Sequence, residues 1–317
     1  MMVRAGGMAA ALVAVAFLPL VAQAPKPALR HARLYGVASS EVLDHVNRDD
    51  ARAALKVWFD VLGEQRGFAL DSRVDVLDSQ AEIRARLENG TVDVLIMGTA
   101  EYVELEKRHL LVPVLAGVRG AGASAQTPYV LLAGRSTSAA KLADLRGKNV
   151  LTASRGAQNT ALAWLEVLLS REHLDRADQF FGSIKTAAKA QNCILPLFFG
   201  TVDACVVDET SMNLARELNP QLNQLRVLAR SRPMLDCIVA TSALHPYPYH
   251  QELVDAMLNL HHDARGRQLL MVFKVDRLIR IEPADFDSAR ELWREYERLP
   301  PPPHRTAATA GSMQGGN

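Results

Sequence analysis

The sequence has no excess of charge, few cysteines and none of the common catalytic motifs. Its 317 residues include 36 lysines and arginines and 35 acidic residues, which argues against a nucleic-acid partner. A Gly-x-Ser-x-Gly elbow, a lysine-containing phosphate loop and a His-Glu-x-x-His helix are all missing. We therefore expect a protein that is not an enzyme and needs no cofactor. An active site assembled from distant residues is the alternative that stays open.

Metal ligands and disulfide partners are also scarce. The histidines within 245–250 and 261–262 have no acid or thiol at metal-ligand spacing, so we expect no metal site. Cys193, Cys205 and Cys237 form an odd set, which allows one disulfide at most. Cys205 and Cys237 lie in strand-like runs, where a small buried thiol is the expected state. A disulfide between these two is the first alternative, and metal ligation is the second.

The two ends of the chain have the composition of segments outside the fold. Arg4 precedes an uncharged stretch that ends in Ala22-Gln23-Ala24, which predicts a secretory signal peptide over residues 1–24. A retained anchor is the alternative. No cysteine lies nearby for lipid attachment, so we expect a protein released into the periplasm. Residues 300–317 are rich in proline, glycine and alanine, and we expect a disordered tail there.

Between these ends, strand-like and helical segments alternate, which is typical of α/β folds. A helix is predicted over 51–62, because Ala51, Leu55, Trp58 and Leu62 share one helical face. Ser79 and Glu82 form a capping-box pattern that predicts the start of the next helix.

An imperfect internal repeat predicts two similar lobes. Gly90-Thr91-Val92-Asp93 precedes an apolar strand, and Gly200-Thr201-Val202-Asp203 precedes another, 110 residues later. An apolar helix is expected before and after each copy, which makes coincidence the weaker interpretation. Each lobe is expected to hold an open mixed sheet flanked by helices.

The carboxyl ends of the two repeated strands are where open α/β sheets bind ligands, so a ligand cleft is expected between the lobes. The chain is predicted to cross near 117–127 and to return near 230–236, through hinge segments. The first lobe is then discontinuous, with residues 29–120 and 236–299, and the second lobe holds residues 121–235.

The order of these segments resembles the phosphate and phosphonate branch of the type II periplasmic binding proteins, which serve ABC importers. The resemblance rests on Tyr129–Arg135 and on Lys141–Val150, the strand and Leu-x-Asp-Leu-x-Gly-Lys phrase that begin the second lobe in that family. Residues 90–93 with the following Tyr102, and residues 198–208, are also similar to segments of this branch. The resemblance implies a solute-binding protein that closes about a hinge over a small oxyanion or an organic acid.

In that family, the loop after the first strand of the second lobe holds the ligand with hydroxyls and amides at a helix amino terminus. Here this loop reads Thr-Ala-Ser-Arg-Gly-Ala-Gln-Asn-Thr over residues 152–160, so only part of the hydroxyl set is kept. Arg155, Gln158 and Asn159 are larger polar groups, suited to an amide, a carboxylate or a differently placed anion.

Strand ends and this loop together supply the candidate ligand-binding residues. Each has a competing structural role, such as capping a helix or turn for the serines and acids, packing for Tyr102, and solvation for Arg155. The candidates are Ser39, Ser40, Thr99, Tyr102, Arg155, Gln158, Asn159, Thr160, Asp208 and Glu209.

The resemblance also implies partners on separate chains, an ABC permease and its ATPase, and a binding protein that acts as a monomer. The alternative function is a periplasmic sensing module, in which closure over the same small-molecule ligand presents a surface to a membrane receptor or kinase. Nothing in the sequence separates uptake from sensing.

Overall fold

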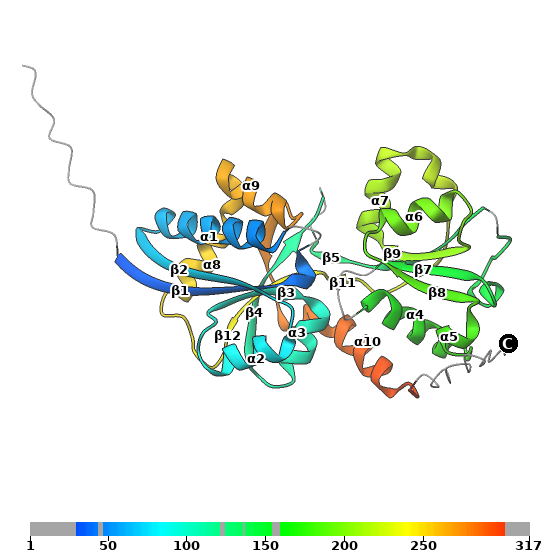
Figure 1. Ribbon diagram of the computed structural model, residues 1–317, viewed down its shortest axis with the longest axis horizontal. Helices are drawn as coiled ribbons and strands as arrows, with labels where there is room; N and C mark the ends of the chain where they lie inside the picture. Colours follow the sequence, from blue (N-terminus) through cyan, green and yellow to red (C-terminus); the bar gives the residue numbers. More distant parts are fainter. Residues whose placement is uncertain (1–29, 44–46, 121–123, 136, 154–158, 302–317) are drawn as a thin grey trace, which may run out of the picture.

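The computed structural model describes residues 30–43, 47–120, 124–135, 137–153 and 159–301. Helices flank two separate mixed sheets, which lie side by side along the long axis of the molecule (Figure 1). The predicted α/β class with two lobes is confirmed.

Lobe I is the unit built on a six-stranded sheet of order β13-β4-β12-β3-β1-β2. Strands β1, β2 and β3 are parallel, whereas β12 runs antiparallel to β3 and β4, and β13 runs antiparallel to β4. The strands are β1 (Arg30–Ser39), β2 (Phe68–Leu77), β3 (Val94–Gly98), β4 (Leu111–Val118), β12 (Cys237–Ser242) and β13 (Arg277–Arg280). Its helices are α1 (Arg48–Gln65), α2 (Gln80–Glu88), α3 (Thr99–Glu106), α8 (His250–Leu258) and α9 (Ala264–Val272), with 3-10 turns η1 (Ser40–Val42), η4 (Leu260–His262) and η5 (Pro283–Phe286).

Lobe II is the unit built on a five-stranded sheet of order β10-β6-β9-β7-β8. Strand β7 is parallel to β8 and β9, and β6 is antiparallel to β9 and β10. The strands are β6 (Tyr129–Ala133), β7 (Asn149–Ala153), β8 (Ser183–Ala187), β9 (Ala204–Asp208) and β10 (Arg226–Arg230). Its helices are α4 (Thr160–Arg171), α5 (Ala177–Phe180), α6 (Gln191–Phe198) and α7 (Glu209–Leu218), with 3-10 turns η2 (Leu142–Leu145) and η3 (Pro220–Gln224).

Helix α1 shows how the apolar pattern fixes the packing of lobe I. Its buried side chains include Ala51, Leu55, Trp58 and Leu62, the face predicted from the sequence, together with Phe59. The ring of Phe59 lies over Gly36 of β1 so closely that a Cβ there would come within 2.1 Å of it. Only glycine permits this contact between helix and sheet.

The two copies of the internal repeat form matching hydrogen bonds. In each copy, a glycine with positive φ ends a helix, at 67° for Gly90 and 76° for Gly200. The Asp93 carboxylate accepts from the Tyr35 amide at 2.7 Å, and the Asp203 carboxylate accepts from the Asn149 amide at 2.9 Å.

The threonines of the repeat match as well. Thr91 Oγ1 donates to the carbonyl of Arg86 at 3.2 Å, and Thr201 Oγ1 donates to the carbonyl of Pro196 at 3.0 Å. The four-residue phrase therefore stops a helix, turns the chain and ties the next strand to its parallel neighbour, in the same way in both lobes.

A short ladder joins the lobes. Strand β5 (Gln126–Thr127) pairs antiparallel with β11 (Met234–Leu235), between the stretches of chain that lead into and out of lobe II. Two crossing segments held together in this way suit a hinge.

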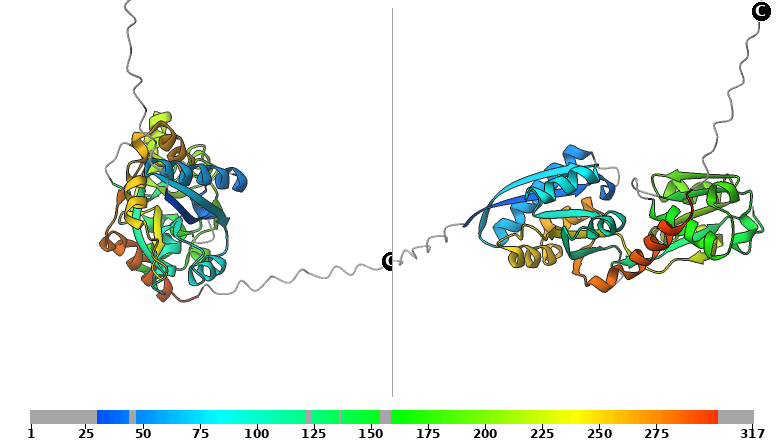
Figure 2. Two further views of the ribbon diagram at one scale, coloured as in Figure 1. Left: turned by 90° about the vertical axis from the view of Figure 1, so that its left-hand side faces the viewer. Right: turned by 90° about the horizontal axis from the view of Figure 1, so that it is seen from below.

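Helix α10 (Asp287–Arg298) packs against both lobes, on α3 of lobe I and on α4 of lobe II. Figure 2 shows it running across the junction. Arg290 Nε donates to Glu106 of α3 at 2.8 Å, and Arg171 of α4 donates twice to Glu295, at 2.9 and 2.7 Å. Its buried Leu292 belongs to an apolar cluster that contains residues of both lobes.

We expect Leu292→Ala to lower the free energy of unfolding by about 2–4 kcal/mol, because it leaves a cavity where both lobes meet α10. Arg294→Ala, an exposed change on the same helix, is the control and should cost less than about 0.5 kcal/mol. Urea unfolding measures both. Equal effects of the two substitutions would contradict a packing role for α10.

A disulfide joins Cys193 of α6 to Cys205 of β9, with a Cα–Cα distance of 5.8 Å. The expectation of a buried thiol is therefore wrong for Cys205, and so is the alternative bridge from Cys205 to Cys237. Cys237 is buried at the start of β12, in the other lobe. The sequence could not show this, because the pairing depends on α6 packing over β9.

The bridge closes a loop with a sequence separation of 12, so we expect its reduction to lower the free energy of unfolding by about 3 kcal/mol. Urea unfolding with and without a reductant measures this loss. The variant Cys193→Ala/Cys205→Ala should show no further loss with reductant. Detection of three reactive thiols in the unreduced, unfolded protein would contradict the bridge.

Candidate functional site

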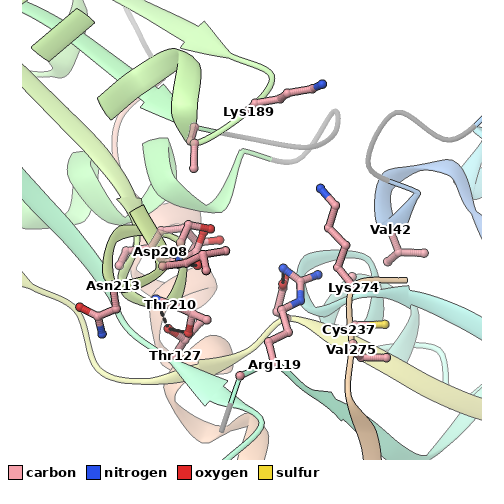
Figure 3. A pocket seen from close by; sticks show the side chains of 18 of the residues that line it. Val42, Arg119, Thr127, Lys189, Asp208, Thr210, Asn213, Cys237, Lys274 and Val275 are labelled. Carbon is pink, nitrogen blue, oxygen red and sulfur yellow. Dashed lines mark hydrogen bonds and ion pairs between the residues drawn. The ribbon is translucent and has the colours of Figure 1, made fainter. Parts of the chain in front are cut away.

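A cleft of about 1010 Å³ lies between the lobes and is lined by residues of both (Figure 3). Its floor includes Thr127 and Leu235 of the hinge ladder. The Thr99 hydroxyl donates to the Leu235 carbonyl at 2.5 Å, and the Thr210 hydroxyl is 3.0 Å from that of Thr127. The first helical residue of α3 and the second of α7 are thus fixed to the hinge at the bottom of the cleft.

Four helices begin at this cleft. Thr99 of α3, Thr160 of α4, Gln191 of α6 and Thr210 of α7 all line it, each in the first turn of its helix. The first amides of a helix have no partner within the helix and carry a partial positive charge. The cleft is therefore rich in groups that bind anions, unless the protein's own acids occupy them.

Acidic residues occupy two of these four helix ends. The Asp208 carboxylate caps α7, accepting from the Ser211 amide at 2.8 Å. Glu101 of α3 reaches back to the Gly98 amide at 3.1 Å. In contrast, α4 and α6 have no acid in the first turn, and α4 is capped by the neutral Asn159. The amino-terminal ends of α4 and α6 are therefore the ones suited to an external anion.

Three cationic side chains border the same cavity, as Figure 3 shows. Lys189 lies two residues before the start of α6. Arg119 follows β4, and its guanidinium is 2.8 Å from the Asp236 carboxylate. Lys274 follows α9 and holds a left-handed backbone with φ of 51°.

Three of the predicted ligand residues, Thr99, Thr160 and Asp208, line the cleft. Asn159 is next to the lining residue Thr160 and caps α4, accepting from the Leu162 amide at 2.9 Å. Its Nδ2 donates to Thr152 at 3.0 Å. Arg155 and Gln158 lie outside the described residues.

Four other predicted residues do not line the cleft. Tyr102 is 2% exposed, with its ring 4.3 Å from that of Phe286 and its hydroxyl donating to Glu106 at 2.9 Å. The structure gives it the packing role weighed as its alternative. Glu209 pairs with Arg230 at 2.9 Å.

The two serines after β1 also have internal partners. The Ser39 hydroxyl donates to Glu101 at 2.6 Å, and the hydrogen bond from Ser40 lowers the pKa of Asp78. Neither serine lines the cleft, although the next residue, Glu41, does.

The three cationic residues were not among those predicted from the sequence. Lys189 follows β8 and precedes α6, so its place at a strand's carboxyl end was a usable signal. Arg119 lies within the stretch taken as a hinge, and hinge residues can face the ligand. Lys274 carried no signal, because its position depends on how α9 packs.

Glu101 is the buried acid of the site. Burial raises its pKa to about 7, and the nearby Glu41 adds to the rise, against the opposing hydrogen bonds from Ser39 and Gly98. Its pKa in the folded state therefore lies above the ordinary value of 4.5. Proton binding by Glu101 stabilises the fold below pH 4.5, and this stabilisation is lost as the pH rises through 7.

Between pH 5 and pH 8 we expect the wild type to lose about 2–3 kcal/mol of unfolding free energy relative to Glu101→Gln, which has no carboxyl group to ionise. Urea unfolding at both pH values measures this. Glu104→Gln, on the exposed side of α3, should follow the wild type. Parallel behaviour of the wild type and Glu101→Gln would contradict the raised pKa.

Among the residues that the structure describes, no group of three or more histidine, cysteine, aspartate or glutamate side chains could hold a metal ion. In the same part of the chain, no helix has the length and apolar character needed to cross a membrane.

Two lobes on separate sheets, a two-stranded hinge and a polar cleft between them define a solute-binding protein of the two-lobed kind. Comparison with protein families gives the particular family. Residues 42–286 match the family described as ABC transporter, phosphonate, periplasmic substrate-binding protein, and the chain belongs to it. It is thus a periplasmic substrate-binding protein of ABC transporters, as predicted, and this family is not one of enzymes.

Solved structures of similar fold include three from bacteria. XAC2383 from Xanthomonas citri, solved with chloride, has a TM-score of 0.63 at 17% identity, covering 84% of this chain and 98% of its own. A binding component of an ABC phosphonate transporter from Pseudomonas aeruginosa gives 0.59 at 12%, covering 84% and 87%. PhnD1 from Prochlorococcus marinus, solved with methylphosphonate, gives 0.57 at 13%, covering 84% and 99%. A search of curated proteins found no match.

Proposed function

We propose that this protein binds one small organic oxyanion, a phosphonate or a carboxylate, in the cleft. The anionic group lies at the amino-terminal ends of α4 and α6. The observation that carries the proposal is the absence of acids from the first turns of these two helices, beside Lys189. Partially positive amides and an ammonium group together favour an oxyanion.

The rest of the ligand faces acceptor groups. Asp208 lines the cleft as the cap of α7, and Asn213 lies one turn further along the same helix. A carboxylate and an amide oxygen accept hydrogen bonds, so they suit a ligand hydroxyl or amine. The cleft is therefore polarised, with one part suited to the anionic group and another suited to donors.

Binding is coupled to hinge closure in this proposal. A ligand that contacts both lobes stabilises the closed arrangement through contacts that form only there. We place the lobe boundaries at residues 120/121 and 235/236, beside the β5–β11 ladder. The chain contains both halves of the cleft, which supports action as a monomer that delivers ligand to a permease and ATPase on separate chains.

Ligands of the structural neighbours agree with this class. PhnD1 was solved with methylphosphonate, and XAC2383 was solved with ATP as well as with chloride. The three ligands, methylphosphonate, ATP and chloride, are all anions, and the first two contain phosphorus oxyanion groups. Because these proteins share only the fold with this chain, they support the class of ligand and not its identity.

Thermal unfolding against phosphate, alkylphosphonates, carboxylates and amino acids tests the proposal. A ligand at about 100 times its dissociation constant adds about 2.7 kcal/mol, a shift of a few degrees for a chain of this size. We expect a selective shift with an oxyanion, and about tenfold weaker binding in Lys189→Ala through the lost charged hydrogen bond.

Lys185→Ala, an exposed lysine on the nearby strand β8, is the matched control and should bind like the wild type. Equal affinity of the wild type and Lys189→Ala would place the anion elsewhere in the cleft. The absence of a shift with any oxyanion would contradict the proposed ligand class.

A further inference from the structure

Glu101 is a buried carboxyl group beside the cleft that the proposed function does not use. It is 2% exposed, and its two oxygens accept from the Ser39 hydroxyl at 2.6 Å and from the Gly98 amide at 3.1 Å. Gly98 itself lines the cleft. The carboxylate therefore lies behind the part of the lobe I wall that Gly98 forms.

This carboxylate takes the donors that an anionic ligand would use at that wall. The start of a helix offers free amides and neighbouring hydroxyls to an anion. Here the Gly98 amide and the Ser39 hydroxyl both donate to Glu101, so the protein satisfies them internally. A ligand anion at this wall would find these donors engaged and a like charge behind them.

The charge is poorly screened. At pH 8 Glu101 is mostly ionised, since burial and Glu41 raise its pKa only to about 7. A carboxylate away from solvent acts on a nearby ligand more strongly than an exposed one, because the effective dielectric constant is lower. Glu41, which lines the cleft on the same lobe, adds a second acidic group to this side.

We propose, building on the function given above, that Glu101 determines the charge selectivity of the cleft. It makes the part of the lobe I wall around Gly98 unfavourable for a second anionic group, whereas Arg119 and Lys274 line other parts of the cleft on the same lobe. The protein therefore prefers ligands with a single anionic head group and an uncharged or cationic remainder.

The test compares two probes with the same head group. Methylphosphonate carries the phosphonate alone, and phosphonoacetate adds a carboxylate at the other end. By titration calorimetry at pH 8 and low salt, we expect Glu101→Gln to improve phosphonoacetate binding about tenfold and methylphosphonate binding less than about threefold. An unchanged affinity ratio would overturn the proposal.

Two further variants separate charge from packing. Glu104→Gln removes one carboxylate from the exposed side of the same helix, where it pairs with Lys107 at 2.8 Å, and should keep the wild-type ratio. Ser40→Ala removes a neighbouring hydroxyl that bonds Asp78 and leaves the Glu101 charge in place, and it should also keep the wild-type ratio. A changed ratio in either variant would overturn the assignment to the Glu101 charge.

A ligand-free measurement keeps this proposal apart from the proposed function. Cys237 lines the cleft, pairs in register with Gly98, and is outside the disulfide, so it reports the potential at this wall. The measured quantity is the rate of Cys237 labelling by anionic dithionitrobenzoate divided by its rate of labelling by neutral dithiodipyridine. We expect Glu101→Gln to raise this ratio about fivefold. If neither phosphonate binds any variant, the proposed function fails. An unchanged labelling ratio overturns the role of Glu101 in either case.

Discussion

The packing of α10 across both lobes is the constraint on which the rest of the structure depends. Its Leu292 lies in an apolar cluster that extends from Leu95 and Met97 of lobe I to Trp164 and Leu165 of lobe II. The ladder of β5 and β11 is only two residues long on each side and could not fix two lobes by itself. Helix α10 joins them at a second place, so two connections limit how the lobes can move relative to each other. A cleft bounded by two such lobes can close on a ligand without the lobes separating.

The same helix explains why Tyr102 does not line the cleft. Phe286, just before α10, covers the tyrosine ring, and Arg290 binds the Glu106 carboxylate that accepts from the tyrosine hydroxyl. Burial and Glu106 raise the pKa of Tyr102, so it remains a neutral donor inside this network. Tyr102 is four residues after the end of β3, and a side chain at this position of α3 can face either the cleft or the opposite side of the helix. The element that packs there decides between the two, and here that element comes from the other end of the chain.

The sequence was sufficient for features that depend on local chemistry. The α1 stripe, the Ser79 cap and the repeated Gly-Thr-Val-Asp phrase each act within a few residues, and the structure shows each in its predicted role. The capping box is only half formed, because the Glu82 carboxylate binds Arg86 instead of reaching back. Features that depend on long-range packing were missed or left open, including the Cys193–Cys205 bridge, Lys274 and the orientation of Tyr102. Thr99, Thr160 and Asp208 line the cleft because strand ends in a parallel arrangement meet at one edge, which sequence order alone implies.

The internal repeat also gives the cleft its polarity. Helices α3 and α7 follow the two repeated strands, and an acid binds the amino-terminal amides of each. This acid is Glu101, the third residue of α3, and Asp208, the N-cap of α7. Helices α4 and α6 correspond in order to α1 and α2 of lobe I, which have acids in their first turns, whereas α4 and α6 have none. The cleft receives one helix end from lobe I, that of α3, and three from lobe II, those of α4, α6 and α7, and the distribution of acids makes these ends unequal. Because helix dipoles act only over about a turn, this local difference is what directs the anion to α4 and α6 in the function that we propose, with the ligand's donors toward the acid-capped ends.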